Sequence, residues 1–344
     1  MKKSKKTNKE TKKRQRKPQN EEQKMLKKVR DLSPVHVVEV ELEVLEFQDW
    51  KLQRIQEHLR QIRNTILGEL HKNYHQMIRT KLHKRTLNRY ISVVKLIEKE
   101  RDKKQLSLLQ KEKTRLTKQF EELRNKYNVT FEFARKYGEY LKDNVFLLPD
   151  AVTVLSVCEM VWTSMENIIF GNSKKSYFYK KDDYITLQAK QAERCIILKH
   201  NDIENTFDVS FNGMHFPLMV KKNDLFIEET LSNIVYYMKS GTEIDNQNVE
   251  RHKLGLTPYP TYRIRNNRIV RKNIRGKNRY YVQIVLEGTP VVKRKKDGSL
   301  RHNYGVGRVA NDVGTQSVAI VSKHTAFLKN LAERSENTFK YERK

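Results

Sequence analysis

The alternation in residues 35–47, VHVVEVELEVLEF, constrains the local fold more sharply than any other stretch of the chain. Apolar and acidic residues alternate along this run. The apolar positions are Val38, Val40, Leu42 and Val44, and the acidic positions between them are Glu39, Glu41 and Glu43. Successive side chains of a strand point to opposite faces of a sheet, so the pattern predicts one half-buried β-strand directly after Pro34.

The period of the sequence then changes from that of a strand to that of a helix. From Trp50 to Leu70, apolar residues recur at the spacing of one buried helix face. Residues 87–127 contain no glycine or proline and mix both charge signs, which is typical of a solvated helical hairpin or bundle. Pro149 and Asp150 then open a more apolar helix. We therefore expect a helical region over residues 49–171.

Residues 172–302 return to short β-branched and aromatic runs separated by turn sequences such as Asn212-Gly213. The clearest predicted strand is RYYVQIVLEG, residues 279–288. The predicted fold class is therefore α+β. A β-rich domain is assembled from residues 34–48 and 172–302, and the helical region interrupts it.

The charge of the chain narrows the kind of partner. Its 344 residues include 70 Lys and Arg against 41 Asp and Glu, a formal net charge of +29. Such a balance favours a polyanionic partner, with nucleic acid as the leading candidate. Residues 1–33 are basic and poor in apolar side chains, so we expect a disordered basic arm there. The longest apolar run, Val145 to Trp162, is too interrupted to span a membrane, and a protein of the bacterial cytosol or nucleoid is expected.

A dense basic segment, RIRNNRIVRKNIRGKNR, spans residues 263–279 without an acidic residue. A phosphate backbone can lie along such a surface, and flanking tyrosines can stack on unpaired bases. The alternative is a basic, solvated loop. The candidate nucleic-acid-binding residues are Arg263, Arg265, Arg268, Arg271, Lys272, Arg275, Lys277, Arg279 and Tyr280.

Near the other end of the sequence, Asp312 lies in the first of two predicted strands, 308–313 and 317–322. The short GTQ connection makes these strands an antiparallel pair. A carboxylate on such a strand is a candidate metal ligand for phosphodiester chemistry, although two ions need more than one carboxylate. His71 and His75 share a helical face but have no evident third metal ligand.

Three stretches resemble one known family. RVANDVGTQSVAIVS is similar to the first RuvC motif of the TnpB-type (orfB) transposase family, RNA-guided DNA endonucleases related to type V CRISPR effectors. The stretches RYYVQIVLEGTPVV and LLPDAVTVLSVCEMVW also resemble that family. The resemblance implies a β-barrel wedge domain (34–48 and 172–302), interrupted by a helical recognition domain (49–171). It also implies an incomplete RNase H-like, or RuvC, domain over residues 303–344.

The implied partners are a guide RNA and double-stranded target DNA, with base pairing to the guide selecting the target. The implied parent reaction is Mg²⁺-dependent DNA cleavage, with Asp312 as a catalytic residue and metal ligand. Only that one family carboxylate has a counterpart here, so the chain is expected to be an amino-terminal portion that ends shortly after the first RuvC motif. We expect it to bind RNA and DNA without cleaving alone. The alternatives are a non-catalytic RNA-guided transcriptional repressor and a decayed transposase fragment.

Overall fold

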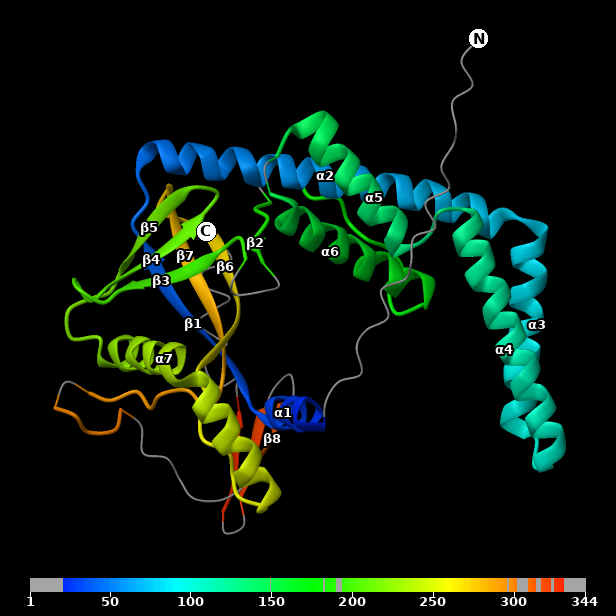
Figure 1. Ribbon diagram of the computed structural model, residues 1–344. Coiled ribbons are helices and arrows are strands. Elements are labelled where there is room, and N and C mark those ends of the chain that lie inside the picture. The colour runs from blue at the N-terminus through cyan, green and yellow to red at the C-terminus, as the bar shows by residue number, and fades with distance from the viewer. Residues whose placement is uncertain are drawn as a thin grey trace. The chain divides into compact units, whose positions relative to one another are not determined.

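The structure is a computed structural model in which the chain divides into two units, Met1–Val291 and Val292–Lys344 (Figure 1). The residues that the structure describes are 21–148, 150–181, 183–189, 194–295, 297–301, 309–313, 317–322 and 325–330. No helix among these residues is long and apolar enough to cross a membrane.

The first unit is built around one antiparallel sheet of seven strands with the order β2-β6-β7-β1-β5-β4-β3. The sheet curls into a half-barrel, with β2 and β3 as its two edges (Figure 1). A half-barrel replaces the barrel that the family resemblance implies. The strands are β1 (Val35–Leu42), β2 (Leu187–Gln188), β3 (Ile197–Asn201), β4 (Thr206–Phe211), β5 (Met214–Met219), β6 (Arg263–Ile274) and β7 (Lys277–Glu287).

Strand β1 occupies the centre of this sheet and pairs with β7 along its whole length, from Val35 opposite Glu287 to Leu42 opposite Tyr280. The prediction that this strand is half-buried is confirmed, because Val38, Val40 and Leu42 are all buried in the main core. The intervening glutamates face the other side of the sheet. The strand predicted after Pro34 and the strand predicted at 279–288 are both confirmed, and they are neighbours.

Helices fill the region between β1 and β2, as the change of period predicts. They are α2 (Glu46–Arg79), α3 (Lys81–Lys99), α4 (Lys103–Lys126), α5 (Phe131–Leu141), the π-helical turn η1 (Lys142–Phe146) and α6 (Ala151–Ile169). The Asp150 side chain accepts hydrogen bonds from the backbone N–H groups of Val152 and Thr153, which caps α6 as the sequence indicates. Phe170 and Gly171 end this helix, with Gly171 at a φ of 77°.

A glycine lets α5 approach α6 closely. A Cβ atom at Gly138 would lie 2.4 Å from the sulfur of Cys158 and 3.3 Å from Cδ1 of Ile66. Because no side chain fits at the first of these distances, glycine sets the separation of α5 from α6 and α2. The buried stripe of α2, including Leu59, Ile62 and Ile66, lies in the same core.

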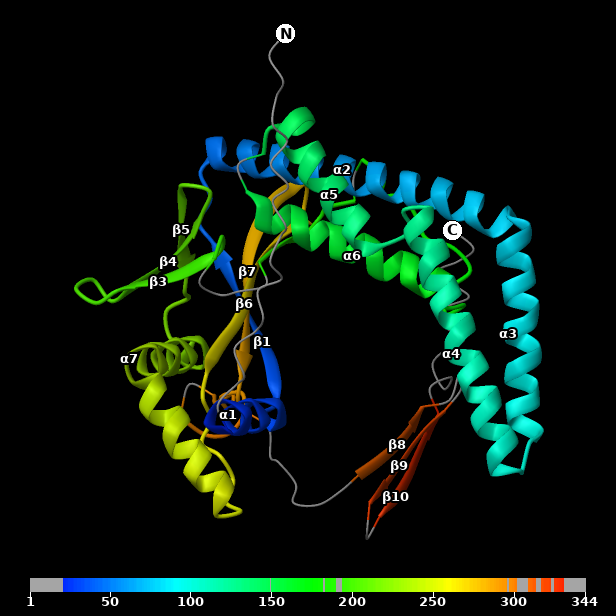
Figure 2. The same ribbon diagram turned by 45° about the vertical axis from the view of Figure 1, so that its right-hand side comes forward.

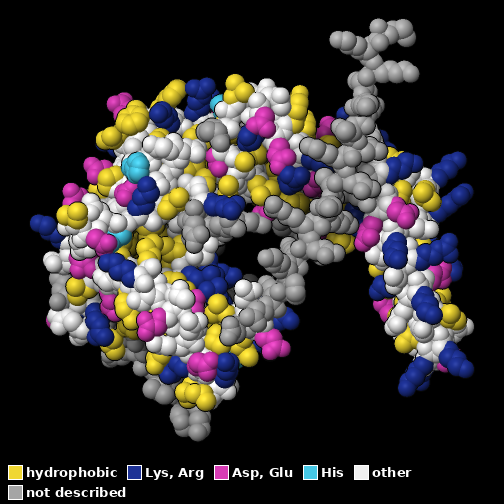
Figure 3. All heavy atoms as spheres, viewed as in Figure 1, with side chains coloured by type: hydrophobic (Ala, Val, Ile, Leu, Met, Phe, Trp, Pro, Cys, Tyr) yellow, Lys and Arg dark blue, Asp and Glu magenta, His cyan; other side chains and the backbone are white. Residues whose placement is uncertain are grey.

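Helices α3 and α4 form the predicted helical hairpin and lie side by side in both ribbon views (Figures 1 and 2). Only two side chains on each are buried: Thr86 and Val93 on α3, Leu116 and Leu123 on α4. Their outer surfaces carry many Lys and Arg side chains (Figure 3). An exposed ion pair, Arg89 to Glu112, links the two helices.

Two helices differ from the expectations. Residues 21–32, predicted to belong to a disordered arm, form α1 (Glu21–Leu32), where Val29 is buried and Arg30 pairs with Asp245. Residues 225–253, expected to be strand-like, form α7 (Leu225–Lys253), which Asp224 caps. Contacts between α1 and α7 explain why the short, basic α1 is ordered. The rest of the predicted arm, 1–20, lies outside the described residues.

The second unit contains three antiparallel strands in the order β10-β9-β8. They are β8 (Val309–Val313), β9 (Ser317–Ser322) and β10 (Ala326–Asn330). The predicted antiparallel pair is confirmed, with Asp312 in register with Ala319. Residues 326–330 form a third strand along β9. Phe327 and Leu328 are 54% and 70% exposed on this edge strand.

Candidate nucleic-acid interface

The basic segment forms most of a β-hairpin, here called the basic hairpin, made of β6, β7 and the turn between them. Ile274 pairs with Lys277, so only Arg275 and Gly276 form the turn. Their φ angles are 54° and 78°, as a type I′ turn requires, and this turn matches the twist of the strands. Arg275 has a left-handed backbone that glycine or asparagine adopts more easily, at a cost of about 1 kcal/mol. The turn therefore holds a cation at the exposed tip.

Half of the predicted basic residues are paired with carboxylates from other strands. On the outer face of the sheet, Lys272 pairs with Glu39 at 2.5 Å and Arg279 pairs with Glu41 at 3.1 Å. Burial alone would raise the pKa of Glu39, but hydrogen bonds from Lys272 and Gln283 outweigh it and lower that pKa. These carboxylates come from the alternate face of β1, so the outer face of the sheet carries both charge signs.

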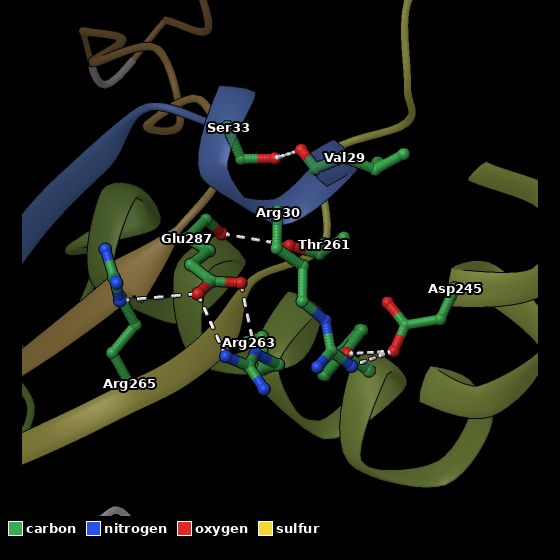
Figure 4. Close-up of polar contacts among 9 residues, drawn as sticks. Val29, Arg30, Ser33, Asp245, Thr261, Arg263, Arg265 and Glu287 are labelled. Carbon is green, nitrogen blue, oxygen red and sulfur yellow. Dashed lines mark hydrogen bonds and ion pairs between the residues drawn. The ribbon is translucent and has the colours of Figure 1, made fainter. Parts of the chain in front are cut away.

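A buried carboxylate holds two more of the arginines (Figure 4). Glu287, 2% exposed, accepts two hydrogen bonds of 3.0 Å from Arg263, while Nε of Arg265 lies 3.3 Å from the same carboxylate. Arg265 occupies a β-bulge, and both guanidinium groups reach the carboxylate of Glu287. The two arginines therefore have a clear structural role at the base of the basic hairpin.

Figure 4 also shows how α1 is attached beside this cluster. Arg30 donates to the carboxylate of Asp245 at 2.5 Å, and the hydroxyl of Tyr237 donates to the same carboxylate at 3.1 Å. Burial and the nearby Asp245 carboxylate raise the pKa of Tyr237 to about 12, so its hydroxyl stays protonated as a donor at neutral pH. The base of the basic hairpin is thus a network of paired charges.

The other four basic residues have no carboxylate within ion-pair distance in the described parts of the chain: Arg268, Arg271, Arg275 and Lys277. Arg275 and Lys277 are exposed at the tip of the basic hairpin. Arg271 points to the opposite side of the sheet, where its guanidinium lies 3.4 Å from the ring centroid of Tyr184. Positive charge without a carboxylate partner therefore lies at the tip, at Arg268 and at Arg271.

Tyr280 is not available for base stacking, and the prediction for this residue is corrected. Its ring is 1% exposed, and its hydroxyl donates to Asp49 at 2.7 Å. Strand parity explains the difference, because Tyr280 faces the core and Tyr281 faces outward. Lys272 lies 4.6 Å from the ring centroid of Tyr281.

The metal candidates receive little support from the described side chains. Asp312 has a defined backbone position in β8, but its side chain lies outside the description. The rings of His71 and His75 are 6.1 Å apart, and Nε2 of His71 hydrogen-bonds Ser176. Among the described residues, no three His, Cys, Asp or Glu side chains gather as a metal ion would need. No fit to Mg²⁺ is therefore shown, and no chemical step is assigned to it.

Together these features define an α+β protein with a curled antiparallel sheet and a basic hairpin whose tip is free to meet a polyanion. No protein-family model matches the chain. No curated protein matches it either. Among solved structures, it is similar to a chain in the cryo-EM structure of the Cas12f1–sgRNA–target DNA complex, with 9% identity and a TM-score of 0.32. That alignment covers 90% of this chain and 68% of the other.

Proposed function

We propose that this protein is an RNA-guided DNA-binding protein of the TnpB type. The observation that carries the proposal is the basic hairpin, which presents Arg275 and Lys277 at an exposed tip on a chain with a net charge of +29. Cations free of ion pairs can replace the counterions of a phosphate backbone, whereas paired ones contribute less. The sequence resemblance around Asp312 supports the finer assignment to an RNA-guided family.

In this proposal, guide RNA and double-stranded DNA are the partners, and the wedge-type half-barrel and the helical region contact them. Asp312 is the residue that the resemblance assigns to Mg²⁺-dependent cleavage. We propose that this chain alone binds nucleic acid without cutting it. A non-catalytic repressor would share the binding, so a cleavage assay on the purified RNA complex separates binding from cutting.

The decisive experiment is to express the chain with its own flanking DNA and to sequence the RNA that survives a high-salt wash. The expected result is one defined RNA species from the flank, because a guide is retained by shape and base contacts as well as charge. A mixture of cellular RNA that washes away with salt would contradict RNA guidance and leave only nonspecific binding.

Charge changes in the basic hairpin test the interface itself. Arg275→Ala with Lys277→Ala should reduce the salt dependence of RNA affinity by about 1.4 to 1.8 in log–log slope, since each neutralised phosphate contributes about 0.7 to 0.9. Glu41→Gln should have the opposite effect and steepen the slope by up to about 0.9, because it releases Arg279 from its ion pair.

The matched control replaces an ion pair without changing net charge. Glu39→Gln with Lys272→Gln should leave affinity within about twofold, because that pair is already neutral. Fluorescence anisotropy at several salt concentrations measures all three variants. Equal slopes for wild type and the tip variant would show that the basic hairpin does not touch phosphate.

A further inference from the structure

A cleft of about 400 Å³ opens where the first turns of α2 meet β6 and the segment before β2. That volume falls in the range of small-ligand pockets. The lining residues that matter here are Trp50, Arg54, Gln56, Lys181, Tyr184 and Arg271. Of these, only Arg271 belongs to the basic segment, so the cleft is distinct from the hairpin tip.

The side of the cleft opposite α2 is formed by an extended segment, here called the strap and defined as residues 177–181 and 183–185. The side-chain amide of Asn64 accepts from the N–H of Tyr179 at 2.9 Å and donates to its carbonyl at 2.8 Å. Further along the strap, Gln56 donates to the carbonyl of Ile185 at 2.8 Å. These bonds from α2 hold both ends of the strap and thereby set the position of Tyr184.

Two aromatic rings of the cleft are accessible, and each lies beside a guanidinium. Trp50 is 59% exposed, with Arg54 at 5.5 Å from its ring centroid. Tyr184 is 36% exposed, with Arg271 at 3.4 Å from its ring centroid. An exposed tryptophan in a polar cleft offers a large flat surface on which a planar ring can stack.

The charge balance of the cleft favours an anion. Hydrogen bonds from Arg60 hold the pKa of Glu57 at about 2, so this carboxylate stays ionised and its charge is met by Arg60. Asp183 also lines the cleft, where its carboxylate accepts a hydrogen bond from the backbone N–H of Lys180. The cations Arg54, Lys181 and Arg271 therefore outnumber this one remaining carboxylate. Within the described residues, no carboxylate comes within ion-pair distance of Arg54, Lys181 or Arg271.

Two polar atoms beside the cleft also lack partners in the described structure. Gln56 is 3% exposed and its Oε1 accepts no hydrogen bond, while Nε of Arg271 donates none. A buried acceptor or donor left unpaired loses the hydrogen bonds that it made with water and gains none in return. Such a cost is expected where a ligand, rather than the protein, completes the hydrogen bonding.

We propose that this cleft binds one unpaired nucleotide, with its base stacked on Trp50 and its phosphate held by Arg54, Lys181 and Arg271. This inference rests on the proposed function and deepens it, because it assigns the cleft to a single-stranded segment instead of a duplex. A flat base matches the open aromatic ring, and a phosphate matches the three cations. Neither an apolar ligand nor a cation would use both features.

Tryptophan fluorescence tests the proposal directly, because the chain has two tryptophans. In a Trp162→Phe background, the emission comes from Trp50 alone. Single-stranded oligouridine and oligothymidine of about 10 nucleotides serve as probes, with a blunt duplex as the comparison. The expected result is quenching by a single strand but not by the duplex. Quenching by oligouridine alone would assign the cleft to RNA, and quenching by oligothymidine alone to DNA.

Affinity measurements with labelled strands provide the second readout. Trp50→Ala should weaken single-strand binding by about five- to 150-fold, the range found for one base–aromatic stack. The matched control is Phe47→Ala, since Phe47 is 54% exposed on the same helix, has Lys51 beside its ring and lies outside the cleft. That change should alter affinity by less than about twofold.

The outcomes separate this inference from the proposed function. Salt-dependent binding without quenching, together with unchanged affinity of Trp50→Ala, would overturn the cleft assignment and leave the basic hairpin as the interface. Absence of binding to every strand and duplex would overturn both. Circular dichroism of each variant tests whether it is folded. We expect the Trp50 and Phe47 variants to fold, because both residues lie at the surface.

Discussion

Replacing Glu287 by glutamine is expected to lower the free energy of unfolding by about 3 kcal/mol, measured by chemical denaturation of the full chain. Glu287 is almost fully buried and is the shared partner of Arg263 and Arg265. Removing one member of a buried ion pair costs about 3 to 5 kcal/mol, and the partial exposure of both arginines places this case at the lower end. Glutamine keeps the shape of the side chain, so the loss reports charge.

Two comparisons make this prediction specific. Adding Arg263→Met to Glu287→Gln should restore part of the lost stability, because it removes one of the two cations left without a carboxylate. Glu39→Gln, at a partly exposed pair on the same sheet, should cost less than about 1 kcal/mol. Equal losses of unfolding free energy for Glu287→Gln and Glu39→Gln would show that the buried ion pairs stabilise the fold no more than the partly exposed one.

Arg63→Ala is expected to lower the free energy of unfolding by about 2 to 4 kcal/mol. The Arg63 guanidinium lies 3.6 Å from the ring centroid of Tyr179 and donates to the carbonyl of Tyr177 at 3.0 Å. A desolvated cation–π contact contributes about 2 kcal/mol, and a hydrogen bond from a charged donor contributes about 1.5 to 3 kcal/mol. Burial lowers the pKa of Arg63, a sign of the desolvation that offsets part of this gain.

The control for this arginine is Arg135→Ala. Arg135 is surface-exposed and pairs with Glu132 and Glu139 within α5. Its removal should change stability by less than about 1 kcal/mol. Because Arg63 anchors the strap, Arg63→Ala should also weaken single-strand binding at the cleft. A stability loss at Arg63 no larger than at Arg135 would mean that desolvation cancels its contacts.

The local elements of the fold were largely predictable from the sequence. The strand after Pro34, the helices from α2 to α6 and the strand β7 all follow from the period of apolar residues and from capping residues such as Asp150. Helix α7 was missed, although Asp224 precedes it and its buried residues Ile227, Thr230, Leu231 and Ile234 have helical spacing. Its aromatic and β-branched side chains favoured a strand by propensity, and tertiary burial overrode that preference.

Pairings between distant segments were not predictable. The run 263–279 contains no acid, but its carboxylate partners lie on β1 and at the end of β7, and only the sheet register brings them together. Whether Tyr280 or Tyr281 is buried depends on which face of β7 the core covers. The cleft was missed for the same reason, since its residues come from α2, the strap and β6. An isolated Trp50 on a predicted helix gave no indication of it.

The central position of β1 has a consequence for synthesis on the ribosome. The hydrogen bond between His36 and the carbonyl of Gly288 joins residues 252 positions apart. Until β7 leaves the exit tunnel, the nascent chain contains a hydrophobic strand without its principal neighbour, while the locally connected helices α2 to α6 can already pack. The half-barrel is therefore completed only after these helices have been synthesised. Slowing translation before residue 287 should lengthen the time during which β1 needs protection by a chaperone.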